Sequence, residues 1–130
     1  MIKFKYTILY VADVTQAISF YERTFQFQRK FITPENDYGE LDTGDTTISF
    51  ASHTLASKNI ADGFITSDLS QSPLGIELGI TTDTVEELVQ QALHNGATLV
   101  ASPAHKTWGQ TVAYIRDIDG FLIEICTPIS

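Results

Sequence analysis

In the first 52 residues, the apolar positions have the spacing of a helix in one segment and the pattern of strands in the segments around it. Asp13 is placed to cap the helix, and apolar residues follow at helical spacing from Val14 to Phe25. The flanking segments are rich in aromatic and β-branched residues, as strands are. The predicted strands fall at residues 3–11, 27–33, 38–42 and 46–52. This part of the chain therefore predicts the order β-α-β-β-β.

The same order returns in the second half of the chain. Asp83 is placed to cap a second helix, which Asn95 and Gly96 end. The predicted strands fall at residues 75–81, 98–101, 110–116 and 121–127, with a loop at 102–109. Residues 53–74 are rich in Ser, Ala and Asp, and we interpret them as a linker with a helical turn.

The two copies share residues as well as elements. Asp42-Thr-Gly-Asp45 followed by Ile48-Ser-Phe50 parallels Asp117-Ile-Asp-Gly120 followed by Ile123-Glu-Ile125. A repeated unit that cannot close its own core is expected to pair with its copy. We therefore expect one α+β domain in which each helix packs outside a curved mixed sheet and the inner faces form a cleft. The predicted bounds are 1–52 for the first module, 53–74 for the linker and 75–130 for the second module, within a single domain of residues 1–130.

Composition narrows the classes of partner. The chain has 8 basic and 16 acidic residues, a formal net charge of −8. Nucleic acids and anionic membranes are therefore not expected as partners, since phosphate binding needs clustered Lys and Arg. Cys126 is the single cysteine, so an internal disulfide is excluded. We see no signal peptide and no long apolar run, so a soluble cytoplasmic protein is expected.

Three local motifs carry a resemblance to a known family. They are Leu9-Tyr-Val-Ala-Asp13 leading to Ile18-Ser-Phe-Tyr21, then Asn95-Gly-Ala97, then Arg116-Asp-Ile-Asp-Gly120 leading to Ile123-Glu-Ile125. In this order and spacing the chain resembles the vicinal oxygen chelate superfamily, which includes glyoxalase I, bleomycin-resistance proteins and extradiol dioxygenases. The resemblance covers essentially the whole chain and implies the paired β-α-β-β-β fold. It also implies a homodimer.

The resemblance identifies four positions where metal-dependent members carry His or Gln, Glu, His and Glu. Carried over one at a time, these positions fall on Tyr6, Ser49, Gly75 and Glu124. Only Glu124 matches, and one carboxylate cannot hold a transition metal. We therefore expect no cofactor. A divalent metal held by an unusual set of His53, Glu77 and Glu124 is the alternative.

Strand alternation extends the set of residues that face the predicted cleft. Glu77 lies in an otherwise apolar strand, where it is a base, an anchor for a cationic ligand, or a carboxylate at the rim. Trp108 lies in a segment similar to the Trp-Gly loop of bleomycin-resistance proteins, where it is a stacking wall or a plug over the core. The candidate catalytic residues are Glu77 and Glu124, and the candidate ligand-binding residues are Tyr6, Tyr10, Ser49, His53 and Trp108.

Three functions fit this pattern. The first is a metal-free protein of the glyoxalase/bleomycin-resistance type that binds a small organic molecule. The second is an enzyme, a lyase or isomerase resembling lactoylglutathione lyase, that uses an unusual metal set or acid–base chemistry. The third is a protein-interaction module.

Overall fold

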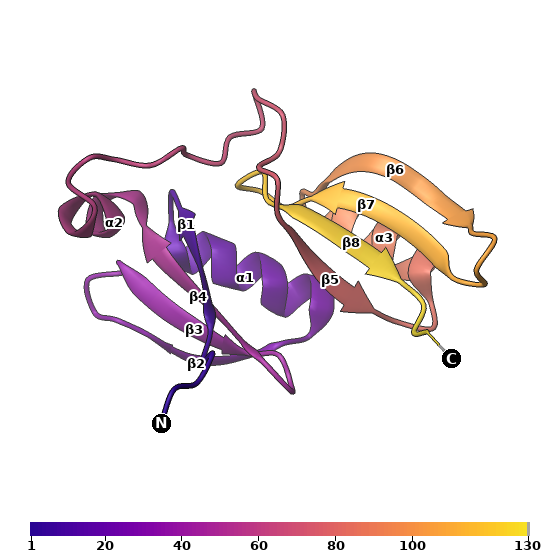
Figure 1. Cartoon of the computed structure of the whole chain (residues 1–130), viewed down its shortest axis with the longest axis horizontal. Helices are drawn as coiled ribbons and strands as arrows, with labels where there is room; N and C mark the ends of the chain where they lie inside the picture. Colours follow the sequence, from indigo (N-terminus) through magenta and orange to yellow (C-terminus); the bar gives the residue numbers. More distant parts are fainter. Residues whose placement is uncertain (130) are drawn as a thin grey trace. The chain divides into compact units, whose positions relative to one another are not determined.

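The computed structural model describes residues 1–129, which form two compact units (Figure 1). The first unit spans Met1–Thr66 and the second begins at Ser67. This boundary falls inside the predicted linker, and the first part of that segment is the helix α2 (His53–Asn59) of the first unit. The described residues contain eight strands and three helices in the order β-α-β-β-β-α followed by β-α-β-β-β. The predicted α+β class and the repeated order of elements are confirmed.

A four-stranded mixed sheet forms the first unit, and its strands run in the order β1-β4-β3-β2. β1 pairs with β4 in parallel, and the other neighbours are antiparallel. The helix α1 contacts β2, β3 and β4 and so covers one face of the sheet. The bounds are β1 (Thr7–Val11), α1 (Val14–Phe25), β2 (Gln28–Ile32), β3 (Tyr38–Asp42) and β4 (Thr47–Ser52).

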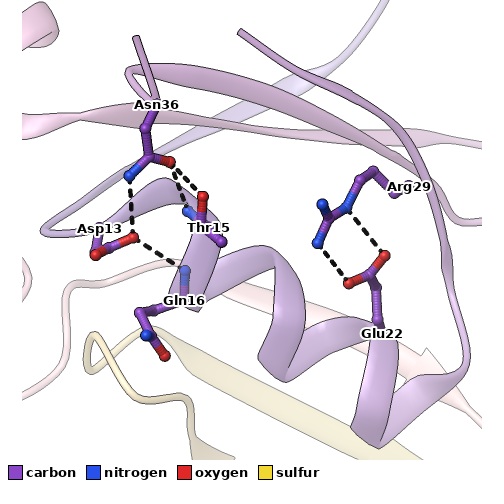
Figure 2. Close-up of polar contacts among 6 residues, drawn as sticks. All are labelled: Asp13, Thr15, Gln16, Glu22, Arg29 and Asn36. Atoms are coloured by element: carbon purple, nitrogen blue, oxygen red, sulfur yellow. Dashed lines mark hydrogen bonds and ion pairs between the residues drawn. The ribbon is translucent and has the colours of Figure 1, made fainter. Parts of the chain in front are cut away.

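The predicted cap of α1 is confirmed and is supported from the β2–β3 loop. Asp13 Oδ1 accepts a hydrogen bond of 3.0 Å from the Gln16 amide (Figure 2). Asn36 accepts from the Thr15 amide at 3.0 Å and donates to Asp13 at 3.4 Å, which ties the loop to the start of the helix. Near the other end of the helix, Glu22 forms a 3.0 Å ion pair with Arg29 of β2.

The second unit repeats this sheet, with strand order β5-β8-β7-β6 and a parallel β5–β8 pair. The helix α3 contacts β6, β7 and β8 and covers one face. Its apolar stripe is buried at Val85, Val89 and Ala92. The bounds are β5 (Glu77–Thr81), α3 (Val85–His94), β6 (Thr98–His105), β7 (Thr111–Arg116) and β8 (Leu122–Cys126).

Several predicted element ends differ from the structure, and a partner strand or a cap decides those of β1, β6 and α3. β1 begins at Thr7 rather than at residue 3, since its pairing with β4 begins there. β6 runs on to His105, because it stays paired with β7 through two register shifts. The N-cap of α3 is Thr84 rather than Asp83, and its side chain makes no capping hydrogen bond.

A buried arginine fixes the segment that opens the second unit. The Arg116 guanidinium donates to the main-chain oxygens of Gly120 at 2.9 Å, Gln71 at 2.7 Å and Asp68 at 3.0 Å. Ser67 Oγ adds a 2.8 Å hydrogen bond to the oxygen of Asp119. The β7–β8 turn and the start of the unit are thereby held together.

Apolar side chains fill the space between each sheet and its helix. Phe20, Tyr21 and Phe50 are fully buried in the first unit, and Ile115, Ile123 and Ile125 in the second. Across residues 1–129, every helix is too short or too polar to cross a membrane.

Candidate ligand-binding faces

One face of each sheet is covered by a helix, and the candidate site residues that belong to the strands lie on the other face. In the first unit the Phe50 ring packs on Tyr21 of α1 at 5.3 Å, so the neighbouring Ser49 points to the opposite face. In the second unit Ile123 and Ile125 are fully buried, and Glu124 between them is half-buried on the opposite face. We call these opposite faces the uncovered faces.

The strand registers relate the two uncovered faces position by position. Ile8 of β1 lies opposite Ser49, as Gly79 of β5 lies opposite Glu124. Tyr6 precedes Ile8 by two residues, and Glu77 precedes Gly79 by two, so Glu77 is the counterpart of Tyr6. The assignment of Gly75 to this position was wrong, because the strand registers place Glu77 there and Gly75 two residues further from the paired strands.

Two carboxylates and a phenol lie together on the uncovered face of the second unit. Tyr114 of β7 donates a 2.9 Å hydrogen bond to Glu124 Oε2. This hydrogen bond, together with burial, raises the pKa of Tyr114 to about 12. The Glu77 side chain is exposed, yet its partial desolvation raises the pKa of the carboxyl, and the Glu124 carboxylate raises it further. Among residues 1–129, neither glutamate forms an ion pair.

The same face continues toward the single tryptophan. Glu124 acts with burial to raise the pKa of the Cys126 thiol, and burial is the larger cause. Gln110 Nε2 donates to the Thr127 oxygen at 2.7 Å, and Gln110 Oε1 accepts from Trp108 Nε1 at 2.7 Å. The indole is therefore held at its nitrogen while its ring is 66% exposed. The interpretation of Trp108 as a plug over the core is wrong, and its ring is available for stacking.

In the first unit the predicted residues divide into two groups. Tyr10 and His53 both contact the ring of Phe64, with ring centroids 4.7 and 6.2 Å apart. His53 is the first residue of α2, and its Nε2 is buried with no hydrogen-bond partner among the described residues. Tyr6 is 42% exposed and lies on the uncovered face with Ser49, which is fully buried.

Sequence reasoning missed Tyr38 and Glu40 of β3. Tyr38 donates a 2.8 Å hydrogen bond to Glu40 Oε2, and Glu40 lies opposite Ser49 in the register. Burial raises the pKa of Tyr38 to about 12, and Glu40 raises it as well. The alternation of residues 38–42 places these two side chains on one face and is the signal that could have found them.

The side chains at these positions do not fit the metal set of the family. Within either unit, no group of three or more His, Cys, Asp or Glu side chains among residues 1–129 could hold a metal ion. Glu77 and Glu124 supply two carboxylates, whereas Tyr6 and Ser49 supply hydroxyl groups, which are poor ligands for nickel, zinc or iron when neutral.

Comparison with solved structures confirms the fold. A glyoxalase/bleomycin resistance protein/dioxygenase family enzyme from Burkholderia phytofirmans PsJN is 25% identical, with a TM-score of 0.81 over 95% of this chain and 96% of that one. A glyoxalase-related enzyme from Fulvimarina pelagi is 17% identical, with a TM-score of 0.80 over 98% and 89% of the two chains. TioX from Micromonospora sp. ML1 is 19% identical, with a TM-score of 0.70 over 96% and 98%.

The sequence profile of the Glyoxalase-like domain matches residues 4–130. The fold and the repeated module thus define a protein of the vicinal oxygen chelate superfamily. Within it, the chain belongs to the Glyoxalase-like domain family. No curated protein matches the sequence.

Proposed function

We propose that this protein binds a small organic cation with a planar aromatic part, and that it does so without a transition metal. The observation that carries the proposal is the row of side chains on the uncovered face of the second unit. Glu77 and Glu124 lie at one end without an ion pair, and the exposed ring of Trp108 lies at the other. A positive charge and an aromatic plane are the two ligand features that such a row recognises.

The charged hydrogen bond contributes more free energy than the stacking contact. Stacking on an aromatic ring is worth about 0.5–1.5 kcal/mol beyond burial. A hydrogen bond with a charged partner is worth about 1.5–3 kcal/mol. Loss of the Trp108 ring should therefore weaken binding by up to about tenfold, and loss of the Glu77 charge by roughly tenfold to a hundredfold. Tyr6, Tyr10, Ser49 and His53 belong to the proposal as residues of the first unit that bind the same class of ligand.

The raised pKa of Glu77 favours a second function. A carboxylate that holds its proton more tightly than usual is a stronger base, so Glu77 is suited to accept a proton in a lyase or isomerase reaction. Both functions use the same residues, but they differ in the fate of the ligand. A bound probe that is recovered unchanged supports binding, whereas turnover that Glu77→Gln abolishes supports the enzyme.

The test uses Trp108 itself, because the emission of a single tryptophan reports on one place in the chain. We titrate the protein with N-methylquinolinium, a planar cation, and with quinoline, its neutral analogue. We expect the cation to quench Trp108 saturably and quinoline to bind at least tenfold more weakly. Glu77→Gln should weaken the binding of the cation. Glu86→Gln on α3 should leave this binding unchanged, since α3 covers the other face of the sheet.

Calorimetry completes the test, since it measures binding to Trp108→Ala as well. Equal affinity of the wild type, Glu77→Gln and Trp108→Ala would overturn the site. Loss of binding after treatment with a chelator would overturn the metal-free part of the proposal.

We also propose that the protein is a cytoplasmic homodimer. Support comes from the apolar side chains of the first six residues, since Met1, Ile2 and Phe4 are almost fully exposed. Exposed apolar groups of this kind mark interaction surfaces. Sedimentation at micromolar concentration should give twice the 14.4 kDa mass of the chain, and a mass of 14.4 kDa would contradict the dimer.

A further inference from the structure

The uncovered face of the first unit has a polar centre, of which the proposed function uses only Ser49. Glu40 of β3 is half-buried and holds the hydroxyl of Tyr38 at 2.8 Å. Ser49 of β4 lies opposite Glu40 in the register and is completely buried. Its Oγ makes no hydrogen bond of good geometry among residues 1–129, although it lies close enough to the Tyr38 phenol to oppose the rise in the pKa of that group.

Apolar side chains surround this polar centre on both sides. Phe31 of β2 lies opposite Glu40 in the register and packs its ring 5.9 Å from that of Tyr38. Ile8 of β1 lies opposite Ser49 on the other side. Both side chains are largely exposed, at 44% and 41%. A carboxylate between exposed apolar groups suits a ligand that joins a cation to a hydrocarbon part.

The chain leaves the charge of Glu40 unmatched. Among the described residues, Glu40 makes no ion pair. The ammonium group of Lys30 of β2 donates instead to Thr47 Oγ1 at 2.9 Å. The Tyr38 hydroxyl occupies one acceptor position of the carboxylate and holds it in place, and an ionised carboxylate has further acceptor positions to offer.

We propose that Glu40, Tyr38 and Ser49 form a binding site for the ammonium group of a primary or secondary amine that carries an apolar substituent. The ammonium donates one hydrogen bond to Glu40 and a second to Ser49 Oγ, once the side chains over Ser49 move aside. Its apolar part lies against Phe31 and Ile8. This site shares Ser49 with the first-unit residues of the proposed function, but it does not depend on the anchors of that function, Glu77 and Glu124.

The experiment maps binding on the isotope-labelled full chain by amide chemical shifts. The probes are 2-phenylethylammonium, its trimethylammonium analogue, which has no N–H, and the neutral 2-phenylethanol. We expect saturable shifts at the amides of Tyr38, Glu40 and Ser49 with the first probe. The trimethylammonium probe should bind several-fold more weakly, and the alcohol at least tenfold more weakly.

Four variants test the roles of the side chains. Glu40→Gln, which keeps an acceptor for Tyr38, should lower the affinity for 2-phenylethylammonium by tenfold or more. Glu35→Gln removes the same charge from the neighbouring loop and should leave binding within twofold. Ser49→Ala should weaken the binding of the primary amine but not that of the trimethylammonium probe. Lys30→Gln should leave binding unchanged or strengthen it, because a competing positive charge is removed.

The outcomes separate this site from the proposed function. Shifts at Tyr38, Glu40 and Ser49 with none near Glu77 and Glu124 support this site and count against the proposed one for this ligand. Shifts confined to the second unit overturn this site. It is also overturned if Glu40→Gln binds within twofold of the wild type, if the alcohol binds as well as the amine, or if no shift saturates at concentrations on the order of 10 mM.

Discussion

Replacing Arg116 by alanine is the sharpest test of how the second unit is held together. Arg116 is only 7% exposed, and its guanidinium donates to three main-chain oxygens. The Gly120 oxygen lies in the turn that follows β7, and the oxygens of Asp68 and Gln71 lie in the segment that opens the unit. Alanine removes all three donors and leaves a cavity between the turn and this segment.

The expected loss follows from these three hydrogen bonds. A hydrogen bond to a charged group contributes about 1.5–3 kcal/mol, so three independent bonds would sum to more than 4.5 kcal/mol. The bonds are not independent, and once the segment is released, water solvates the oxygens of Asp68 and Gln71. The bond to Gly120 is buried and is lost in full. We therefore expect Arg116→Ala to lower the free energy of unfolding by about 3 kcal/mol.

This loss is measured by unfolding the protein in urea. Far-ultraviolet circular dichroism and the emission of Trp108, which lies in the same unit, monitor the unfolding. Hydrogen exchange should also become faster at the amides of residues 68–71, because the segment is released. The matched control is Arg29→Ala, which removes an exposed ion pair and should cost less than about 1 kcal/mol. A loss below about 1 kcal/mol for Arg116→Ala, or unchanged exchange at residues 68–71, would refute the reasoning.

Three further predictions concern two turn glycines, one in each unit, and the tyrosine and carboxylates on the uncovered face of the second unit. Gly44→Ala, at φ +104° with open space around the new Cβ, should cost about 1–2 kcal/mol in urea unfolding. Gly120→Ala, at φ +92° with main-chain carbon 3.1 Å from the new Cβ, should cost at least about 1 kcal/mol more, and equal costs would contradict the packing account. The raised pKa of Tyr114 stabilises the folded state below pH 10, and this contribution should be lost as the pH rises through about 12; Tyr114→Phe should flatten that dependence in unfolding measurements. Glu124→Gln should lower the pKa of Glu77 in a carboxyl-detected NMR titration, and an unchanged value would show that the two carboxylates do not interact.

The order of elements was predictable because it depends on local spacing. Apolar residues at helical spacing defined α1 and α3, and Asp13 caps its helix as expected. The ends of β5 and β6 were not predictable, since a strand ends where its partner ends. Arg116 shows the same limit: two of its three partners lie 45 and 48 residues earlier in the chain.

The candidate site was predictable in part for a similar reason. Alternation along a strand placed Glu77 and Glu124 on one face, and the structure brings them close enough for Glu124 to raise the pKa of Glu77. The hydrogen bond from Trp108 to Gln110 could not be predicted from the sequence, because both residues lie in or beside a predicted loop. Glu40 could not be linked to Ser49 from the sequence, because the register that places the two residues opposite each other depends on strand pairing and not on local spacing.

The pKa of Glu77, measured with and without a bound cation, tests the central claim most directly. If the Glu77 carboxylate contacts the positive charge of N-methylquinolinium, saturation with that probe must lower the pKa of Glu77, since a nearby cation favours the ionised form. Saturation with quinoline should leave the pKa of Glu77 unchanged, at the raised value that desolvation and Glu124 cause. A clear fall with the cation alone is the result we predict. An unchanged pKa of Glu77 in the saturated complex would contradict the account, because the ligand would then bind without this carboxylate.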